Sequence, residues 1–203
     1  MTNELVKFTA IVICFVIAAT GRDTVSRRDY VLVTAALAAT VTADFFLVII
    51  NDDIIGVAFF CIVQVLYNMR FGGTARLKVL PFALAAPAVF FAVTGNILVA
   101  VALVYAQLFV LSYAAMLAAL RKRAFSATGS ILIFIGMTAF MLCDICVAIW
   151  NLSLWGVIEN AYGANLAYAA IWLFYTPGQV CLALSSRRFS PVGRGSIPAA
   201  AKE

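Results

Sequence analysis

Two acidic residues lie inside long apolar stretches of the chain. Asp44 stands in "TADFF" and Asp144 in "FMLCDICVAIW", and neither stretch contains a lysine or an arginine. A carboxylate at membrane depth costs roughly 2.5–3.5 kcal/mol even on the most lenient insertion scales. Such residues face the interior of a helical bundle or a water-filled cavity, and they often mark a functional site. Asp44 and Asp144 are therefore the first candidates for catalysis.

Two carboxyl groups in one apolar cavity can divide the roles of acid catalysis between them. Burial and mutual repulsion would keep one protonated as a general acid, while the other stays ionised and stabilises a developing cation. Either Asp44 or Asp144 could be the acid. A structural role is the alternative, in which each is a buried carboxyl hydrogen-bonded to a neighbouring tyrosine or serine.

Several other chemistries lack the residues that they require. Cys143 and Cys146 have CxxC spacing, but the chain has no histidine and no second such pair, so apolar packing is favoured over a zinc site. The absence of histidine also excludes a Ser–His–Asp triad. Every lysine lies at a predicted helix end or in the tail, which argues against a retinal Schiff base inside the membrane. No metal or other cofactor is expected.

Further polar and aromatic residues fall on the same helical faces as the acids, because residues four apart lie one above the other on a helix. The resulting stripes combine apolar bulk with a few hydrogen-bonding groups, as expected of a site for an amphiphile. The candidate substrate-binding residues are Thr40, Gln64, Tyr67, Phe140, Tyr175 and Gln179. Gln64 and Tyr67 could instead make only interhelical hydrogen bonds. Tyr105 and Tyr113 are interpreted as packing residues.

Membrane-spanning helices must position these side chains. Of the 203 residues, 65% are hydrophobic and only 11% are charged, and the mean hydropathy is +1.06, which is not typical of a soluble domain. A helix that crosses a bilayer needs roughly 20 mainly apolar residues. The predicted spans are 5–20, 30–50, 54–71, 79–94, 97–120, 127–150 and 163–185. The expected fold is all-α, a polytopic transmembrane bundle of about seven helices, with eight possible.

The basic residues gather in alternate loops. With seven helices, thirteen of the fourteen lysines and arginines fall in the first, third and fifth loops and in the tail. The positive-inside rule then predicts an external N-terminus and a cytoplasmic C-terminus. Residues 1–186 are expected to form a single transmembrane domain, and 187–203 a disordered basic tail. The basic residues thus indicate topology, and no nucleic-acid partner is expected. The expected location is a bacterial inner or cell membrane.

Three stretches, in this order, carry a family resemblance. The first is "TADFFLVIINDDIIGVAFFCIVQVLYNMRF" (42–71), in which an intramembrane acid and a short turn precede a Gly, a Phe, a polar residue and a Tyr on the next helix. The second is "GMTAFMLCDICVAIW" (136–150) and the third is "YTPGQVCLALS" (175–185). Together they resemble the lysoplasmalogenase family of small polytopic membrane proteins, the YhhN-like family.

This resemblance implies hydrolysis of the vinyl-ether bond of lysoplasmalogens, which yields a fatty aldehyde and a glycerophospho-alcohol. The expected partners are a lysophospholipid or another amphiphilic small molecule, and membrane lipid. The chain departs from the family pattern at three positions: Ala43 replaces a glycine, Cys143 replaces a serine, and Gln64 stands where a histidine is usual. Any step that depends on that histidine is therefore in question. The family also commonly has eight helices.

Two other functional classes fit the same residues. A small-molecule or proton-coupled transporter could use Asp44 and Asp144 as a relay across the membrane. A lipid-binding or assembly partner in a biosynthetic complex would need the two acids only for structure. A transporter would carry its substrate across the membrane without forming a product, whereas a hydrolase would release an aldehyde.

Overall fold

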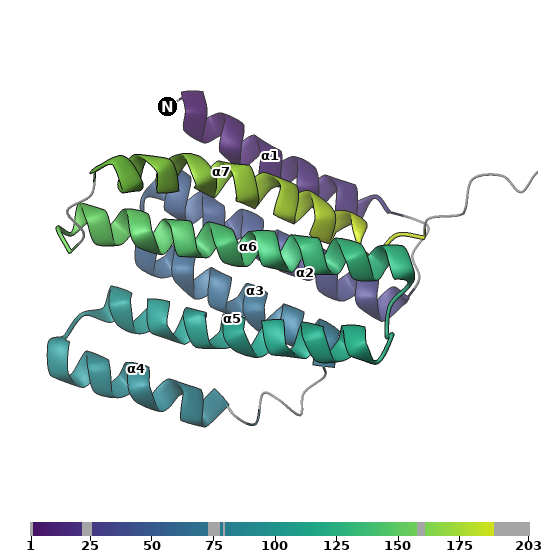
Figure 1. Cartoon of the computed structure of the whole chain (residues 1–203), viewed down its shortest axis with the longest axis horizontal. Coiled ribbons are helices and arrows are strands. Elements are labelled where there is room, and N and C mark those ends of the chain that lie inside the picture. Colours follow the sequence, from purple (N-terminus) through teal and green to yellow (C-terminus); the bar gives the residue numbers. More distant parts are fainter. Residues whose placement is uncertain (1, 22–25, 73–77, 79, 158–160, 189–203) are drawn as a thin grey trace, which may run out of the picture.

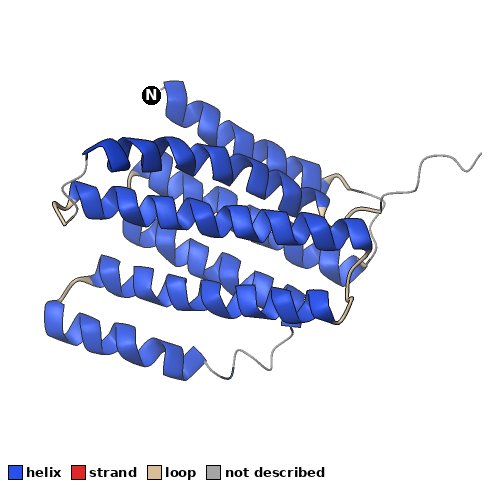
Figure 2. Ribbon diagram, in the orientation of Figure 1, coloured by secondary structure: helices blue, strands red, loops and turns tan. Residues whose placement is uncertain are grey.

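The computed structural model describes residues 2–21, 26–72, 78, 80–157 and 161–188. Within these ranges the chain forms helices and no strand (Figure 2). Seven are α-helices: α1 (Thr2–Ala19), α2 (Arg27–Asp44), α3 (Asp53–Gly72), α4 (Leu80–Thr94), α5 (Ile97–Arg121), α6 (Ala127–Leu154) and α7 (Ala161–Leu184). A π-helical turn, η1 (Phe45–Ile50), continues α2. The predicted all-α bundle of seven helices is confirmed.

The helices run alternately up and down and form one layered bundle (Figure 1). The helices α2, α3, α5, α6 and α7 surround the interior, α1 lies against α2 and α7, and α4 lies at the edge beside α5. By length and apolar composition, five helices can cross a membrane: α2 with η1, α3, α5, α6 and α7. The apolar parts of α1 and α4 are shorter, as the sequence predicted for the first and fourth segments.

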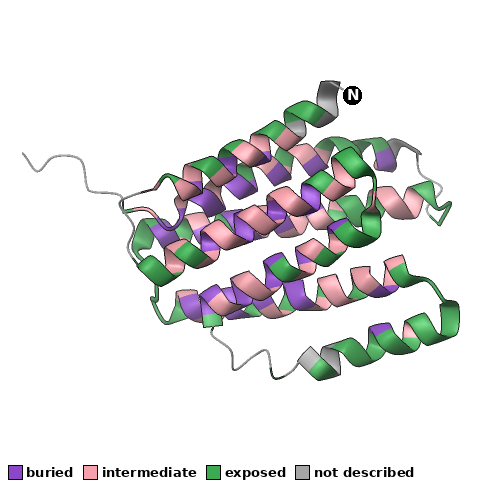
Figure 3. Cartoon of the chain, turned by 180° about the vertical axis from the view of Figure 1, so that it is seen from behind, coloured by how far each residue is buried: buried purple, intermediate pink, exposed green. Residues whose placement is uncertain are grey.

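The outer surface of the bundle is apolar. Large hydrophobic side chains are exposed on helix after helix, such as Val93 on α4, Val110 on α5 and Leu173 on α7, with 79%, 67% and 68% of their surface accessible. Buried residues gather instead on the sides that face other helices (Figure 3). Exposed apolar surface of this extent requires a lipid environment. The chain is therefore a multi-pass membrane protein.

One end of the bundle, where α2 and α6 begin and α3, α5 and α7 finish, is here called the basic end. Its described basic residues include Arg27, Arg28, Arg70, Arg121, Lys122, Arg123, Arg187 and Arg188. Arg187, placed by the sequence at the start of the tail, donates a hydrogen bond to the carbonyl oxygen of Ile17 on α1. The rest of the predicted tail, 189–203, lies outside the described residues, as do Arg22, Arg76 and Glu159.

The helices α6 and α7 approach each other closely at a pair of glycines. A Cβ atom on Gly136 would lie 2.7 Å from the Cγ of Leu182 and 3.0 Å from the carbonyl oxygen of Gly178. A Cβ atom on Gly178 would in turn lie 3.2 Å from the carbonyl oxygen of Gly136. Small residues of this kind let the backbones of membrane helices come together. This contact brings the face of α6 that carries Phe140 and Asp144 against α7.

We expect Gly136→Val to destabilise the bundle, because the new side chain would overlap Leu182 and the α7 backbone. Overpacking of a tight contact typically costs about 1–3 kcal/mol. Thermal unfolding of the purified protein in detergent should show a lower midpoint than the wild type. Ala148→Val is the matched control, since Ala148 lies exposed on the same helix. Equal midpoints for Gly136→Val and the control would contradict this packing.

Candidate active site

Asp44 lies where the backbone of the second membrane span changes its geometry. It is the last residue of α2, and the π-helical turn begins at the next residue. Such turns are uncommon, and they occur frequently at functional sites. Only 6% of Asp44 is accessible, and its Oδ2 accepts a 2.6 Å hydrogen bond from the hydroxyl of Tyr175 on α7. A tyrosine from a distant part of the chain thus holds one carboxylate oxygen.

Asp144 lies on α6 and receives the last bond of a chain of hydrogen bonds. Its Oδ2 accepts a 2.6 Å hydrogen bond from the hydroxyl of Tyr105 on α5. The Nε2 of Gln64 donates to that hydroxyl over 3.5 Å, and the Oε1 of Gln64 accepts a 2.6 Å bond from the hydroxyl of Ser112. Each donor in this series of hydrogen bonds is therefore directed towards the carboxylate of Asp144. Three helices, α3, α5 and α6, cooperate to fix the Asp144 side chain.

The two carboxylates lie at a similar depth in the bundle. Asp44 is 17 residues beyond Arg27, and Asp144 is 17 residues beyond Ala127, the first residues of α2 and α6. At a rise of 1.5 Å per residue, each acid is about 25 Å along its helix from the basic end. Tyr175 is close enough to both carboxylates to interact electrostatically with each of them. The same is true of Cys143. Both acids thus lie around the same interior region of the bundle.

Phe140 is the centre of an aromatic cluster that joins the tyrosines of the two pairs. Its ring centroid lies 6.0 Å from that of Tyr175, 6.0 Å from Phe60 and 5.4 Å from Phe109. Tyr105 in turn packs against Phe60 and Phe109, with centroids 5.9 and 6.1 Å away. An aromatic cluster therefore connects the Asp44 side to the Asp144 side. It gives the candidate site an apolar wall, which suits a hydrocarbon chain.

The structure brings together some of the residues that the sequence assigned to the site, and separates others from it. Phe140, Tyr175 and Gln64 lie with the acids, as described above. Thr40 is buried, but its hydroxyl is bonded to the carbonyl oxygen of Ala36 in its own helix at 2.9 Å. The Thr40 hydroxyl therefore donates within its own helix, and its assignment to substrate binding stays a prediction.

Tyr67 and Gln179 lie closer to the basic end than the acids do. Tyr67 stacks on Phe71, with ring centroids 5.8 Å apart, and it is within electrostatic range of Arg70. Gln179 is one helical turn beyond Tyr175 in that direction. Both side chains are buried, and their polar ends have no hydrogen-bond partner among the described residues. Neither residue makes a hydrogen bond to Asp44 or Asp144, and their assignment to substrate binding stays a prediction.

Sequence reasoning missed two members of the site. The interpretation of Tyr105 as a packing residue is wrong, because its hydroxyl binds Asp144. Ser112, which donates to Gln64, is absent from the predicted site. Tyr105 and Ser112 are seven residues apart, which puts them on one face of α5. This shared polar face is the feature of the sequence that points to both residues. The five cysteines are free thiols, and Cys143 is buried in the core, which agrees with the packing interpretation.

Comparison with known proteins identifies the family. The sequence model that defines the YhhN family matches residues 2–186, which include all seven α-helices and both acids. No curated protein and no solved structure matches the chain significantly. The family match covers nearly the whole chain, and it agrees with the three stretches that carry the resemblance. The chain therefore belongs to the YhhN family, the lysoplasmalogenase family.

Proposed function

We propose that this membrane protein hydrolyses the vinyl-ether bond of lysoplasmalogen-type lysophospholipids. The observation that carries the proposal is the pair of tyrosine–aspartate hydrogen bonds, Tyr175–Asp44 and Tyr105–Asp144, which one aromatic cluster around Phe140 connects. Membership of the YhhN family supports the same reaction class. The site lies inside the bundle, at a depth where an amphiphile from the bilayer can present its ether bond.

The reaction needs a proton donor and a group that stabilises positive charge. A carboxylic acid protonates the β-carbon of the enol ether, which turns the C=C–O unit into an oxocarbenium ion. Water then adds to the carbon that bears the oxygen, and the resulting hemiacetal collapses to a fatty aldehyde and a glycerophospho-alcohol. The second, ionised carboxylate stabilises the cation and accepts a proton from the water. Glycosidases use a similar pair of carboxyls around a similar cation.

The tyrosines position the carboxyls for these roles. Each donates to the Oδ2 of its aspartate, which leaves the Oδ1 of that residue to carry or accept the proton in transfer. Gln64 and Ser112 hold the hydroxyl of Tyr105 in turn. Gln64 stands where the family usually has a histidine, and its role here is to orient Tyr105 rather than to exchange protons. The pair of acids can therefore act without that histidine.

A matched pair of substrates tests the proposal. The purified protein, in detergent or in vesicles, is given a 1-alkenyl lysophospholipid or the corresponding 1-alkyl lysophospholipid, and aldehyde release is measured. We expect aldehyde only from the alkenyl substrate, because a saturated ether has no β-carbon that can be protonated. A 1-acyl lysophospholipid should also be resistant. Transport of the alkenyl lipid without any product, or equal hydrolysis of the acyl lipid, would contradict the proposal.

A further inference from the structure

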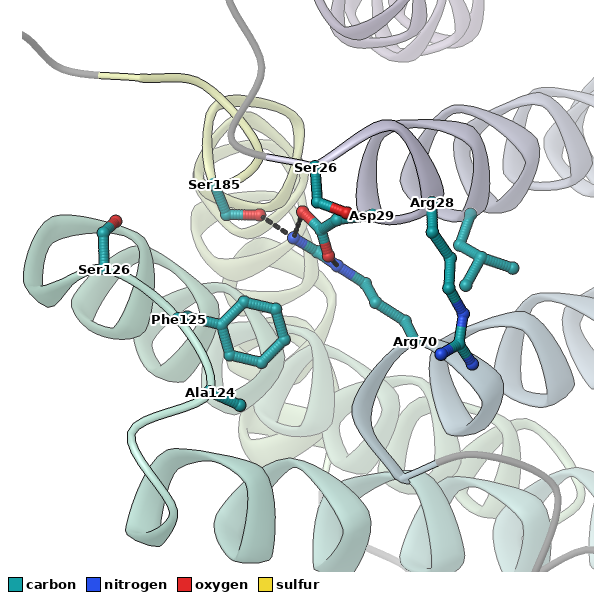
Figure 4. A pocket seen from close by; sticks show the side chains of 9 residues that line it. Ser26, Arg28, Asp29, Arg70, Ala124, Phe125, Ser126 and Ser185 are labelled. Carbon is teal, nitrogen blue, oxygen red and sulfur yellow. Dashed lines mark hydrogen bonds and ion pairs between the residues drawn. The ribbon is translucent and has the colours of Figure 1, made fainter.

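A second polar site lies at the basic end, away from the two acids. It is a cavity of about 220 Å³ between the start of α2, the end of α3, the loop before α6 and the end of α7 (Figure 4). The side chains that line it are Ser26, Arg28, Asp29, Leu32, Arg70, Ala124, Phe125, Ser126 and Ser185. Three hydroxyls and two guanidinium groups thus border one small space. The proposed hydrolysis uses none of these residues.

Arg70 is the central residue of this cavity. Its Nε donates to Asp29 Oδ1 at 2.7 Å, and its Nη2 donates to Asp29 Oδ2 at 3.0 Å and to the Ser185 hydroxyl at 2.9 Å. The guanidinium carbon lies 5.5 Å from the ring centroid of Phe71 and 5.7 Å from that of Phe125. The side chain is fully buried, yet Nη1 has no hydrogen-bond partner among the described residues. One nitrogen of a buried, charged side chain beside the cavity is thus left without a hydrogen-bond partner among the described residues.

The surroundings of Arg70 favour an anion at this donor. Arg28 lines the same cavity, and its Nη2 donates to the carbonyl oxygen of Met69 at 3.2 Å. Because Asp29 balances one of the two arginines, the cavity keeps an excess positive charge. Ser26 and Ser126 are the N-cap residues of α2 and α6, whose N-termini carry partial positive charge. The Ser26 side chain makes no capping hydrogen bond to the described residues of α2, and it lines the cavity.

We propose that this cavity binds a phosphate group, supplied either by a phospholipid headgroup or by free phosphate. A guanidinium with one unpaired nitrogen, a second arginine, the Ser26 and Ser126 hydroxyls and two helix N-termini are groups of the kind that proteins use for phosphate. An ion pair that served only to join α2 to α3 would need neither the unused Nη1 nor the second arginine. The site is distinct from the proposed catalytic site, since the acids lie about 25 Å along their helices from this end. One lysophospholipid has its phosphate and its ether bond on the same glycerol, so it cannot occupy both sites at once.

Binding to the purified full-length chain in a phosphate-free detergent tests this site. Two probes are titrated at constant ionic strength, inorganic phosphate and the short-chain lipid dihexanoyl phosphatidylglycerol, and the thermal unfolding midpoint is followed by tryptophan fluorescence. We expect a saturable rise in the midpoint with at least one probe. Saturation by inorganic phosphate identifies free phosphate as a sufficient ligand, and saturation by the lipid alone identifies a headgroup site. A midpoint that neither probe raises in a saturable way would overturn the proposal.

Two neighbouring arginines provide a matched pair of variants. Arg28→Gln and Arg27→Gln remove the same charge from the first turn of α2, but only Arg28 lines the cavity. We expect Arg28→Gln to weaken binding about tenfold, as befits the loss of one charge-assisted contact, and Arg27→Gln to leave it within about twofold. Ala124→Leu, which fills the cavity without changing its charge, should also abolish binding. Equal affinities for the two arginine variants, or undiminished binding by Ala124→Leu, would contradict the assignment. Neither result depends on whether the protein hydrolyses vinyl ethers.

Discussion

Replacing Asp144 or Asp44 by asparagine is expected to reduce aldehyde release roughly 10²–10⁴-fold, the range that a positioned proton donor or acceptor contributes. Asparagine keeps the shape of the side chain, and its amide oxygen can still accept the tyrosine hydroxyl. It can neither deliver a proton to carbon nor carry the negative charge that opposes an oxocarbenium ion. Because the two acids act as a unit, the double variant should be little worse than the poorer single one.

The control for these variants is Asp53→Asn. Asp53 is exposed at the first turn of α3, at the end of the bundle opposite the basic end. It undergoes the same chemical change without touching the site. We expect wild-type activity from Asp53→Asn, and similar unfolding midpoints for all three variants. Full activity of either Asp44→Asn or Asp144→Asn would disprove the acid pair. A loss of activity that follows a loss of folded protein would instead indicate that the acids serve the structure.

Removing a tyrosine hydroxyl from either pair should give the second-largest effect. Tyr105→Phe deletes the donor to Asp144 and the acceptor for Gln64, and Tyr175→Phe deletes the donor to Asp44. A hydrogen bond to a charged group contributes about 1.5–3 kcal/mol, so the variant beside the ionised acid should lose roughly 10- to 150-fold in kcat/KM, and the variant beside the protonated acid less. Initial rates of aldehyde release over a range of substrate concentrations would measure this loss.

Tyr113→Phe is the matched control for Tyr105→Phe. Tyr113 lies on the same helix, and its hydroxyl pairs with that of Thr138 on α6 at 3.0 Å. Like Tyr105→Phe, Tyr113→Phe removes one tyrosine hydroxyl that bonds α5 to α6. The hydroxyl of Tyr113, however, is bonded to neither acid. We expect near-normal activity from Tyr113→Phe. If both tyrosine variants lose activity equally, then Tyr105 contributes to helix packing and does not position Asp144.

The sequence predicted the helices well, because their main determinant is local. Apolar stretches long enough for a bilayer, separated by short polar breaks, specify where membrane helices begin and end. The same reasoning identified Asp44 and Asp144, since burying a carboxylate is costly wherever its partners lie. The structure extends α6 to Leu154, four residues past the predicted end, because the sequence gives no sharp signal between 151 and 162.

The partners of the acids could not be predicted in the same way. They depend on how each helix is rotated about its axis and on which helices are neighbours, and a single sequence carries little information on either. Tyr105 and Tyr113 look alike along the chain, yet only Tyr105 faces an acid. Tyr67 and Gln179 share helical faces with site residues but lie nearer the basic end. The sequence places Arg70 among the basic residues that indicate topology, whereas the structure buries it in an ion pair with Asp29, 41 residues earlier.

Carbon protonation by a carboxylic acid is the central claim, and hydrolysis in heavy water tests it most directly. The released aldehyde is trapped at once, and its deuterium content is measured by mass spectrometry. If an acid of the protein protonates the β-carbon, the aldehyde formed in D₂O carries one deuterium on the carbon next to the carbonyl. Under the same conditions Asp44→Asn and Asp144→Asn should release almost none of this product. An aldehyde released by the wild type without deuterium at that carbon would contradict the mechanism.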